Sequence, residues 1–337
     1  MSHPRVLIVG GGIAGLGAAH ALAAKGIRAD IVERNPRSDA EGTGIYLPAN
    51  AVRALTALGF GDQIRAVAHE IHRVRLLDHH GRELIDLPID AIWGGIGPSV
   101  AVRHADLRKI LHTDVTVKSF DPADAAGYDL VIGADGIRSA VRDWAFPGAA
   151  GPRSVGELAW RFVVDGYPVD HLWCTWQGKG RTFLAVSLGD GRAYCYADLT
   201  AARPPDDWRA LFDEFPETVR DLVARAKDLH FGAIEEVFVD QVVHGNTVLI
   251  GDAAHAYSPN MAQGAGLALE DALVLADLVG DLDAYAERRI GRARWVRDQT
   301  RRRDKARHLP PAVRDVVLRR LGPRLFRAAF KPLQTQP

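Results

Sequence analysis

The chain has 337 residues, of which 47% are hydrophobic, and its 42 Lys and Arg balance 42 Asp and Glu. This length supports a large core in one large domain or two interleaved domains, and the zero net charge argues against nucleic acid as a partner. The two cysteines are too few for a disulfide framework, so we expect free thiols and a reducing cytosol.

The N-terminal segment predicts a nucleotide-binding unit. Val6 to Val9 is an apolar run typical of a buried parallel strand, Ala14 to Ala24 has the spacing of a helix, and Arg28 to Val32 supplies the next strand. The chain enters the first strand at once, which leaves no room for a signal peptide, and no apolar run approaches the ~20 residues of a membrane span. We therefore expect a soluble, cytoplasmic protein without a membrane span, as a monomer or homodimer.

Further along the chain, the sequence predicts antiparallel strands as well as parallel ones. Arg73 to Leu87 predicts a hairpin and Asp106 to His112 a short helix, while two more apolar strands each run into a glycine at residues 129–132 and 247–250. Between them, short alternating stretches at residues 160–164, 172–176, 182–188 and 192–198 predict an inserted antiparallel sheet rich in aromatic residues. After Glu270 we expect helices, interrupted at Pro310-Pro311 and at Pro323.

The first chemical motif is Gly10-x-Gly12-x-x-Gly15, between the first strand and the first helix. Gly10 permits a tight turn, Gly12 lets the backbone approach a pyrophosphate, and Gly15 lets the helix pack on the strand. The N–H groups of the helix start can bind phosphate. Glu33, at the end of the second strand, can accept hydrogen bonds from the adenosine ribose. This motif leaves NAD and FAD open, and a glycine-rich turn without a ligand is the alternative.

Two later segments add to it. Gly133-Ala-Asp135-Gly136 ends a strand in a polar turn, which by itself is equally consistent with an ordinary strand-to-helix connection. Gly251-Asp252 follows another strand, and a carboxylate held there suits a ribityl hydroxyl. A helix that begins near Gly264 would direct its partial positive charge at a flavin pyrimidine and favour the anionic reduced form.

Together these segments resemble the single-component FAD-dependent aromatic monooxygenases, the p-hydroxybenzoate hydroxylase-like group. The resemblance spans Val6 to about Asp271, although residues 112–127 are shorter than in that family. It implies FAD as the cofactor, NADH or NADPH as a transient co-substrate, and no metal. The FAD-binding residues that it implies are Gly10, Gly12, Ile13, Ala14, Gly15, Glu33, Arg34, Gly44, Ile45, Arg103, Asp135, Gly136, Gly251, Asp252, Pro259, Gly264, Ala265, Gly266 and Leu267.

The fold expected from these observations is α/β. A Rossmann-like, three-layer FAD-binding domain takes residues 1–70, 98–155 and 245–285, and an antiparallel-sheet substrate domain takes residues 71–97 and 156–244. Residues 286–337 form a C-terminal helical region. The expected reaction uses NAD(P)H and O2 to hydroxylate a small aromatic or heteroaromatic substrate through a flavin C4a-hydroperoxide.

The inserted sheet is the expected wall of the substrate pocket, because one face of each strand can line a cavity while the other packs. Ordinary sheet packing is the alternative for each aromatic side chain. The candidates for the pocket are Leu47, Trp160, Phe162, Trp176, Phe183, Tyr194 and Pro259. Tyr194 and Tyr196 are candidates to hydrogen-bond the substrate. His255 is either a general base or a brace for its loop, and the brace is the favoured interpretation.

Other functions share part of this pattern. A flavin-dependent epoxidase or reductase of an isoprenoid-like substrate, or a non-catalytic FAD-binding redox protein, would carry all three segments, whereas an NAD-dependent dehydrogenase would use the first alone. The arginine-rich stretch from Arg288 to Lys331 is most simply a set of solvated helix faces. Its alternative role is to attract NAD(P)H phosphates or an acidic surface.

Overall fold

The computed structural model describes residues 4–35, 42–167 and 169–337, and its strands in these ranges form three sheets. The first sheet has the strand order β15-β16-β9-β1-β2-β8 and is parallel except for the pair β15 and β16. The bounds of its strands are β15 Val243–His244, β16 Thr247–Leu249, β9 Leu130–Gly133, β1 Val6–Val9, β2 Ala29–Glu33 and β8 Thr116–Val117.

Helices cover this parallel sheet, as the buried apolar strands require. Helix α1 (Ile13–Ala23) packs against α9 (Gly264–Asp277), and α6 (Ala140–Ala145) packs against β9 and β16. The βαβ unit expected at the N-terminus is confirmed with its boundaries shifted by one residue. The side chains of β1, β9 and β16 are buried in one continuous hydrophobic core.

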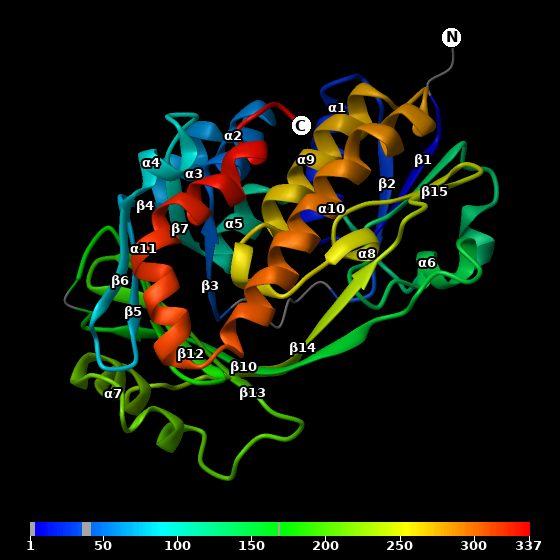
Figure 1. Ribbon diagram of the computed structural model, residues 1–337. Coiled ribbons are helices and arrows are strands. Elements are labelled where there is room, and N and C mark those ends of the chain that lie inside the picture. Colours follow the sequence, from blue (N-terminus) through cyan, green and yellow to red (C-terminus); the bar gives the residue numbers. More distant parts are fainter. Residues whose placement is uncertain (1–3, 36–41, 168) are drawn as a thin grey trace.

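The second sheet is the long one in the lower half of Figure 1, and its order is β14-β10-β13-β12-β11-β5-β6. Its strands are β14 His230–Phe238, β10 Arg153–Asp165, β13 Arg192–Thr200, β12 Arg181–Gly189, β11 Leu172–Gln177, β5 Arg73–Asp78 and β6 Glu83–Pro88. The expected hairpin is confirmed as β5 and β6. The sheet is not wholly antiparallel, because β11 pairs in parallel with β5 and so joins the hairpin to the later strands.

Both faces of the second sheet are covered. One face packs on η2 (Arg209–Phe212) and α7 (Glu217–Ala224), which Figure 1 shows below the sheet. The other face looks toward α10 (Leu282–Arg307) and α11 (Pro311–Phe330), the orange and red helices above it. Neither η2 nor α7 is expected from the sequence pattern, and their position decides which aromatic side chains face the cavity.

A third, small sheet connects the two larger ones. Its order is β3-β7-β4, with β3 Gly44–Leu47, β7 Ser99–Arg103 and β4 His69–Ile71. The helices around it are α2 Ala49–Ala57, α3 Gly61–Val67, α4 Ile89–Trp93 and α5 His104–Ile110. β3 and β7 pair antiparallel, so that Gly44 lies opposite Arg103.

The C-terminal helices depart from the sequence expectation at one proline. Helix α10 ends before Pro310 as expected, but Pro323 lies inside α11 and does not end it. A proline removes one helical hydrogen bond and tends to kink or break a helix. Packing holds this one in place, because Gly322 beside it lies so close to β6 that a Cβ there would be 2.5 Å from Ile85 Cδ1.

The described residues contain no helix with the length and apolar character needed to cross a bilayer.

Candidate functional site

The glycine-rich loop between β1 and α1 has the close contacts that its glycines predict. A Cβ on Gly10 would lie 2.2 Å from the Ala134 carbonyl oxygen, and one on Gly15 would lie 1.9 Å from the Gly10 oxygen. Gly10 also has φ +114°, which L side chains rarely adopt. Gly12 begins α1 and faces open space. Among the described residues no side chain caps this helix start, so the N–H groups of its first turn, which includes Ile13 and Ala14, are available for an anion.

Glu33 lies beside this loop at the end of β2. Its Oε2 accepts a hydrogen bond from the Gly11 N–H at 2.7 Å, and its Oε1 accepts one from the Asn35 N–H at 2.7 Å. These bonds fix the carboxylate next to the glycine turn, and each oxygen keeps a lone pair for a hydroxyl donor. Arg34 is exposed next to it.

The third motif packs directly on the first. Gly251 has φ +57°, and a Cβ there would lie 2.8 Å from the Cβ of Ala14 in α1. Asp252 follows at the start of α8 (Asp252–His255), where its side chain is exposed and lines a large cavity. No side chain or backbone N–H of the described residues donates a hydrogen bond to its carboxylate, which leaves it available to a ligand. Segments about 240 residues apart in sequence thus meet at one edge of the first sheet.

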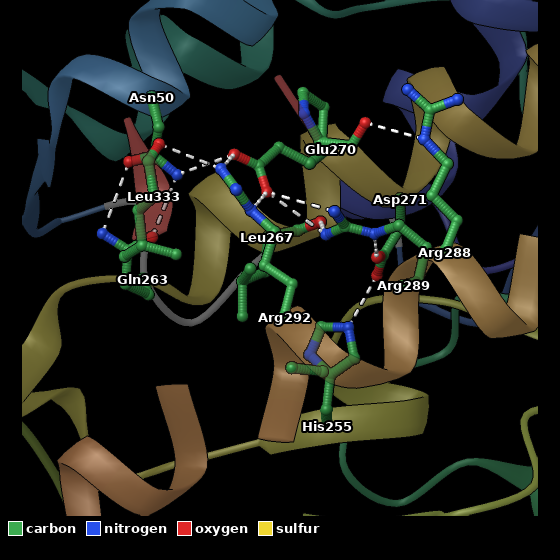
Figure 2. Close-up of polar contacts among 12 residues, drawn as sticks. Asn50, His255, Gln263, Leu267, Glu270, Asp271, Arg288, Arg289, Arg292 and Leu333 are labelled. Atoms are coloured by element: carbon green, nitrogen blue, oxygen red, sulfur yellow. Dashed lines mark hydrogen bonds and ion pairs between the residues drawn. The ribbon is translucent and has the colours of Figure 1, made fainter. Parts of the chain in front are cut away.

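A buried polar network holds the third motif in place (Figure 2). Asp271 on α9 accepts hydrogen bonds from the Gly251 N–H at 2.9 Å and from Arg289 Nε at 2.7 Å, and it contacts His255 Nε2 at 2.6 Å. Glu270 pairs with Arg289 at 3.3 Å and with Arg292 at 2.7 Å. This network is not predicted from the sequence; its signal there is the acidic pair 270–271 followed by arginines on the next helix.

The network extends to α2 and fixes the protonation states of its members. Asn50 Nδ2 donates to Glu270 Oε1 and to Gln263 Oε1, both at 3.0 Å. Burial tends to raise the pKa of Asp271, but His255 and Arg289 outweigh it and hold that pKa at about 2. Burial tends to lower the pKa of His255, and the Asp271 carboxylate more than offsets it, so that this pKa is raised. Asp271 is therefore ionised and stabilises a protonated His255.

His255 is accordingly placed as the brace that the sequence favours. It is 5% exposed and does not line the large cavity. Its Nε2 is engaged by Asp271, and its raised pKa favours the protonated ring, which cannot accept a proton. The side chain therefore contacts α9, behind the loop that carries Asp252, and is directed away from the cavity.

The loop expected over the flavin ring lies on the third sheet. Gly44 is so close to Tyr194 of β13 that a Cβ there would be 2.4 Å from the tyrosine Cβ. Gly44 and Ile45 both line the large cavity. Arg103, opposite Gly44, is exposed and forms two hydrogen bonds to Asp106, at 2.7 and 3.0 Å. That pair fixes the guanidinium near the expected FAD-binding face.

The middle motif is a helix-capping turn in this structure. Asp135 accepts hydrogen bonds from Ser139 Oγ at 2.5 Å and from the Ala140 and Val141 N–H groups at 2.7 and 3.2 Å. These contacts cap α6 and use the carboxylate oxygens for the protein itself. Gly136 has φ +80° and open space where a Cβ would stand. Asp135 therefore forms part of a strand-to-helix connection, which is one of the two interpretations that the sequence allows, and it caps α6.

A cavity of about 630 Å³ lies between β3 of the third sheet, the second sheet, the segment from Asp252 to Ala265 and the C-terminal helices. Its wall includes both candidate flavin residues and candidate substrate residues. The candidates on it from the sequence analysis are Gly44, Ile45, Asp252, Pro259, Gly264, Ala265, Tyr194 and Tyr196. Gly266 and Leu267 follow in α9, where Leu267 is fully buried. A volume of this size is within the range of ligand-binding clefts, roughly 300–1,000 Å³.

The other aromatic candidates do not face this cavity. Trp160, Phe162, Trp176 and Phe183 lie on the opposite face of the second sheet, in the core against η2 and α7. Trp160, for example, stacks on Trp208 with ring centroids 5.4 Å apart. Leu47 is buried in the core of the first sheet. The cavity wall instead takes the alternate residues of the same strands, which are Trp173, Thr175, Gln177, Thr182 and Leu184.

A buried ionic cluster forms part of the cavity wall near α10. Arg307 Nη1 lies 2.5 Å from Glu157 Oε1, and Arg307 also pairs with Asp198. Asp304 accepts a hydrogen bond from Asn260 Nδ2 at 2.5 Å. Burial raises the pKa of Glu157 to about 7, because one guanidinium cannot compensate both neighbouring carboxylates and Asp304 adds further negative charge. The arginine-rich stretch is thus not simply a solvated face: on α10, Arg289, Arg292 and Arg307 are paired with buried acids.

A metal site is not expected from the sequence, but one group of described side chains has suitable ligand types. The ligand atoms of His69, Asp170 and His171 lie within 4.8 Å of one another. His69 Nε2 is already 2.5 Å from Asp170 Oδ1, and the His69 and His171 rings stack at 4.3 Å. We interpret this group as an ion pair beside stacked rings, away from the cavity wall.

The open α1 start, the unpaired Asp252 carboxylate and the cavity that Asp252 lines fit FAD in its chemistry: a diphosphate, a polyhydroxylated chain and a flat ring. The FAD binding domain family matches residues 4–111 and 111–282 of this chain. The two matched segments meet at the shortened stretch, where the structure has little more than β8 and a short 3-10 turn.

Curated relatives and solved structures agree with this match. Aurachin C monooxygenase/isomerase from Stigmatella aurantiaca is 32% identical, over 87% of this chain and 84% of the relative. 2-Heptyl-3-hydroxy-4(1H)-quinolone synthase from Pseudomonas aeruginosa strain UCBPP-PA14 is 30% identical, over 88% and 87% respectively. The crystal structure of Klebsiella pneumoniae HpxO complexed with FAD and uric acid shares the fold, with a TM-score of 0.89 at 24% identity, over 100% of this chain and 98% of that one.

Proposed function

The chain belongs to the FAD binding domain family, among FAD-dependent monooxygenases, and from this premise we propose that it hydroxylates a small aromatic or heteroaromatic substrate with NAD(P)H and O2. FAD would be its resident cofactor. The sequence carries one glycine-rich βαβ unit, which FAD would occupy, so NADH or NADPH would bind only transiently.

The observation that carries this proposal is that residues of the FAD-binding region and residues of the second sheet line one cavity. Asp252, Gly44 and Gly264, from three separate elements of the FAD-binding region, line the same cavity as Tyr194 and Trp173 of the second sheet. A flavin bound along the first group would therefore place its ring beside any molecule held by the second. Bound FAD, once reduced, supplies the activation of O2 and the transfer of one oxygen atom.

The proposed FAD contacts follow from the geometry of each motif. The loop Gly10–Gly15 would hold the pyrophosphate at the start of α1, and Glu33, with Arg34, would bind the adenosine ribose. Asp252 would accept hydrogen bonds from the ribityl chain. Gly44, Ile45, Arg103, Pro259 and the residues at the start of α9, from Gly264 to Leu267, would surround the isoalloxazine. Gly136 would approach the cofactor through its backbone while Asp135 caps α6.

The protein's own contribution to catalysis would be binding, orientation and exclusion of water. Burial raises the pKa of both Tyr194 and Tyr196, so their phenols stay protonated at neutral pH. Tyr194 can therefore donate a hydrogen bond to a phenolic or heterocyclic oxygen, whereas the Tyr196 hydroxyl hydrogen-bonds to Asp198, and neither is suited to act as a phenolate base. Trp173 Nε1 and Gln177 Oε1 on the same wall have no hydrogen-bond partner among the described residues, and they offer one further donor and one acceptor.

The substrate class is proposed from this wall together with the names of the relatives. Those names include a quinolone synthase, urate hydroxylases and hydroxybenzoate hydroxylases, so fused heterocycles and phenols are the first compounds to test. The flavin ring would share the cavity of about 630 Å³ with the substrate, which favours a small ring system over a large one.

The proposal is tested by measuring NAD(P)H oxidation by the purified flavoprotein with phenols, quinolones and purines in turn. We expect at least one of them to accelerate oxidation well above the rate without substrate. Protein stripped of FAD should show no acceleration until FAD is restored. If no aromatic compound accelerates oxidation, a redox protein without this catalytic role gains support, and acceleration by isoprenoids alone would favour the epoxidase or reductase alternative.

A further inference from the structure

Helix α11 carries a row of apolar side chains that face away from the protein. Val313, Val317, Leu321 and Leu325 follow one another at intervals of four residues, so they lie along one side of the helix. Their exposed fractions are 52%, 37%, 46% and 52%. Val316, 45% exposed, lies beside them. Exposed apolar residues scattered singly are ordinary in proteins, but a contiguous row on one helix indicates a surface that another body covers.

Positive charge accompanies this row. Arg320 and Arg324 are exposed on the same outer side, and neither has an ion-pair partner within the described ranges. From Leu309 to Lys331 the sequence contains a single acid, Asp315, which is buried and accepts a hydrogen bond from Arg314 at 2.9 Å. The outer face of α11 is therefore apolar and cationic, with no negative charge of its own.

The row ends at the mouth of the large cavity. Leu325 is half exposed and also lines the cavity, as do Leu318 and Phe326 on the inward side of the same helix. Across the gap, Arg302 and Ala306 of α10 are likewise exposed and line the cavity. The apolar surface of α11 thus continues from the outside of the protein into the proposed substrate site.

We propose that the outer face of α11 docks on an anionic lipid surface. The valine and leucine row would enter the interface between headgroups and acyl chains while Arg320 and Arg324 contact lipid phosphates, the arrangement typical of interfacial amphipathic helices. Leu325 would then bring the cavity mouth to the bilayer, where an apolar substrate is concentrated. No helix of the described residues spans a membrane, so the association is peripheral. In a dimer through this face the partner's copy would offer Arg320 and Arg324 no exposed acid, which disfavours that arrangement.

The test is co-sedimentation of the full-length flavoprotein with vesicles of phosphatidylglycerol and with vesicles of phosphatidylcholine. We expect binding to the first and little to the second, and a marked decrease in high salt. The double variant Val317→Glu/Leu321→Glu should lose about tenfold or more of the partitioning, and Arg320→Gln/Arg324→Gln several-fold. Val67→Glu, a change of equal exposure on α3, is the matched control and should bind like the parent protein.

Because these side chains are exposed, we expect each variant to fold. The flavin spectrum and the melting temperature verify this. The readout is binding alone and does not depend on turnover, so it is independent of the proposed function. Equal binding of parent and variants, or no binding of the parent to phosphatidylglycerol, would overturn the proposal. A solution dimer that Val317→Glu/Leu321→Glu converts to a monomer would overturn it in favour of a second copy as the occupant.

Discussion

The backbone around Asp252 holds its carboxylate in place, but the carboxylate makes no hydrogen bond to a described residue. It follows the tight turn at Gly251 and lies on the cavity wall, and no described residue donates a hydrogen bond to it. The carboxylate would gain hydrogen bonds only when a ligand with hydroxyl donors binds beside it.

We therefore expect Asp252→Ala to weaken FAD binding without unfolding the protein. A hydrogen bond to a charged group contributes about 1.5–3 kcal/mol, which corresponds to a loss of roughly tenfold to a hundredfold in affinity. Titration of the FAD-free protein with FAD, followed by flavin fluorescence, measures it. The control is Asp283→Ala, an exposed acid in the first turn of α10, which should leave the affinity unchanged. Equal affinities of the two variants would remove Asp252 from the proposed site.

The glycine motifs could be predicted from the sequence because their geometry is local. The contacts of Gly10 and Gly15 depend on a turn between one strand and one helix, and a short pattern determines it. Asp135 could not be resolved in this way, because a carboxylate at a strand end can face a ligand or the next helix. In this structure its carboxylate accepts hydrogen bonds from the start of α6, and its contact with FAD stays a prediction.

At the scale of elements, α9 holds the turn before Asp252 in place through a hydrogen bond from the Gly251 N–H to Asp271. Asp271 joins the turn at Gly251 to Arg289 of α10, and all of these groups are buried. Its pKa in the folded protein is depressed to about 2, below its ordinary value of 3.8. Its contribution to stability is therefore complete above about pH 4 and is lost only as the pH falls through about 2.

Asp271→Asn should consequently destabilise the protein at neutral pH. Removing one partner from a buried ion pair costs about 3–5 kcal/mol, and here Arg289 would lose its shorter contact and keep only the one to Glu270 at 3.3 Å. Urea unfolding at pH 7, with and without FAD, measures the loss. Asp277→Asn on the same helix breaks an ion pair to Lys25 that is about half exposed, and it should cost less than about 1 kcal/mol. A loss for Asp271→Asn as small as that of its control would contradict the assigned role of the network.

The two faces of the second sheet should respond differently to substitution. Phe183 is fully buried against Phe212, whereas Tyr194 lines the cavity. Phe183→Leu should cost about 1–2 kcal/mol of stability and leave KM for the aromatic substrate unchanged. Tyr194→Phe should change stability little but reduce kcat/KM by about tenfold through the lost hydrogen bond. Urea unfolding and steady-state kinetics together distinguish them, and the reverse pattern would contradict the assignment of the faces.

The sequence predicts that successive side chains of each strand point to opposite faces of the second sheet. It does not predict which of the two faces meets the cavity. Trp173 and Trp176 are three residues apart on β11 and therefore point to opposite faces. Which face meets the cavity depends on η2 and α7, which pack on Phe162 and Phe183 from a segment between two strands. Such long-range packing leaves no periodic signal in the strands themselves. For the same reason the network between α9 and α10 could not be derived from either helix alone.

For the molecule as a whole, the three glycine segments have unequal roles. The first and third touch, through Gly251 and Ala14, and the third borders the cavity, while the second caps a helix. The second sheet and the two C-terminal helices close the remaining sides of that cavity. This arrangement makes one space in which cofactor and substrate would meet, and the central claim is that an oxygen atom is transferred there.

The most direct measurement of that claim is the fate of isotopically labelled oxygen. The purified flavoprotein is supplied with NAD(P)H, ¹⁸O2 and an aromatic compound that accelerates NAD(P)H oxidation, and the product is analysed by mass spectrometry. We predict a hydroxylated product with one labelled oxygen atom for each NAD(P)H consumed. If the aromatic compound is recovered unchanged and all labelled oxygen appears as hydrogen peroxide, the protein is not the monooxygenase proposed here.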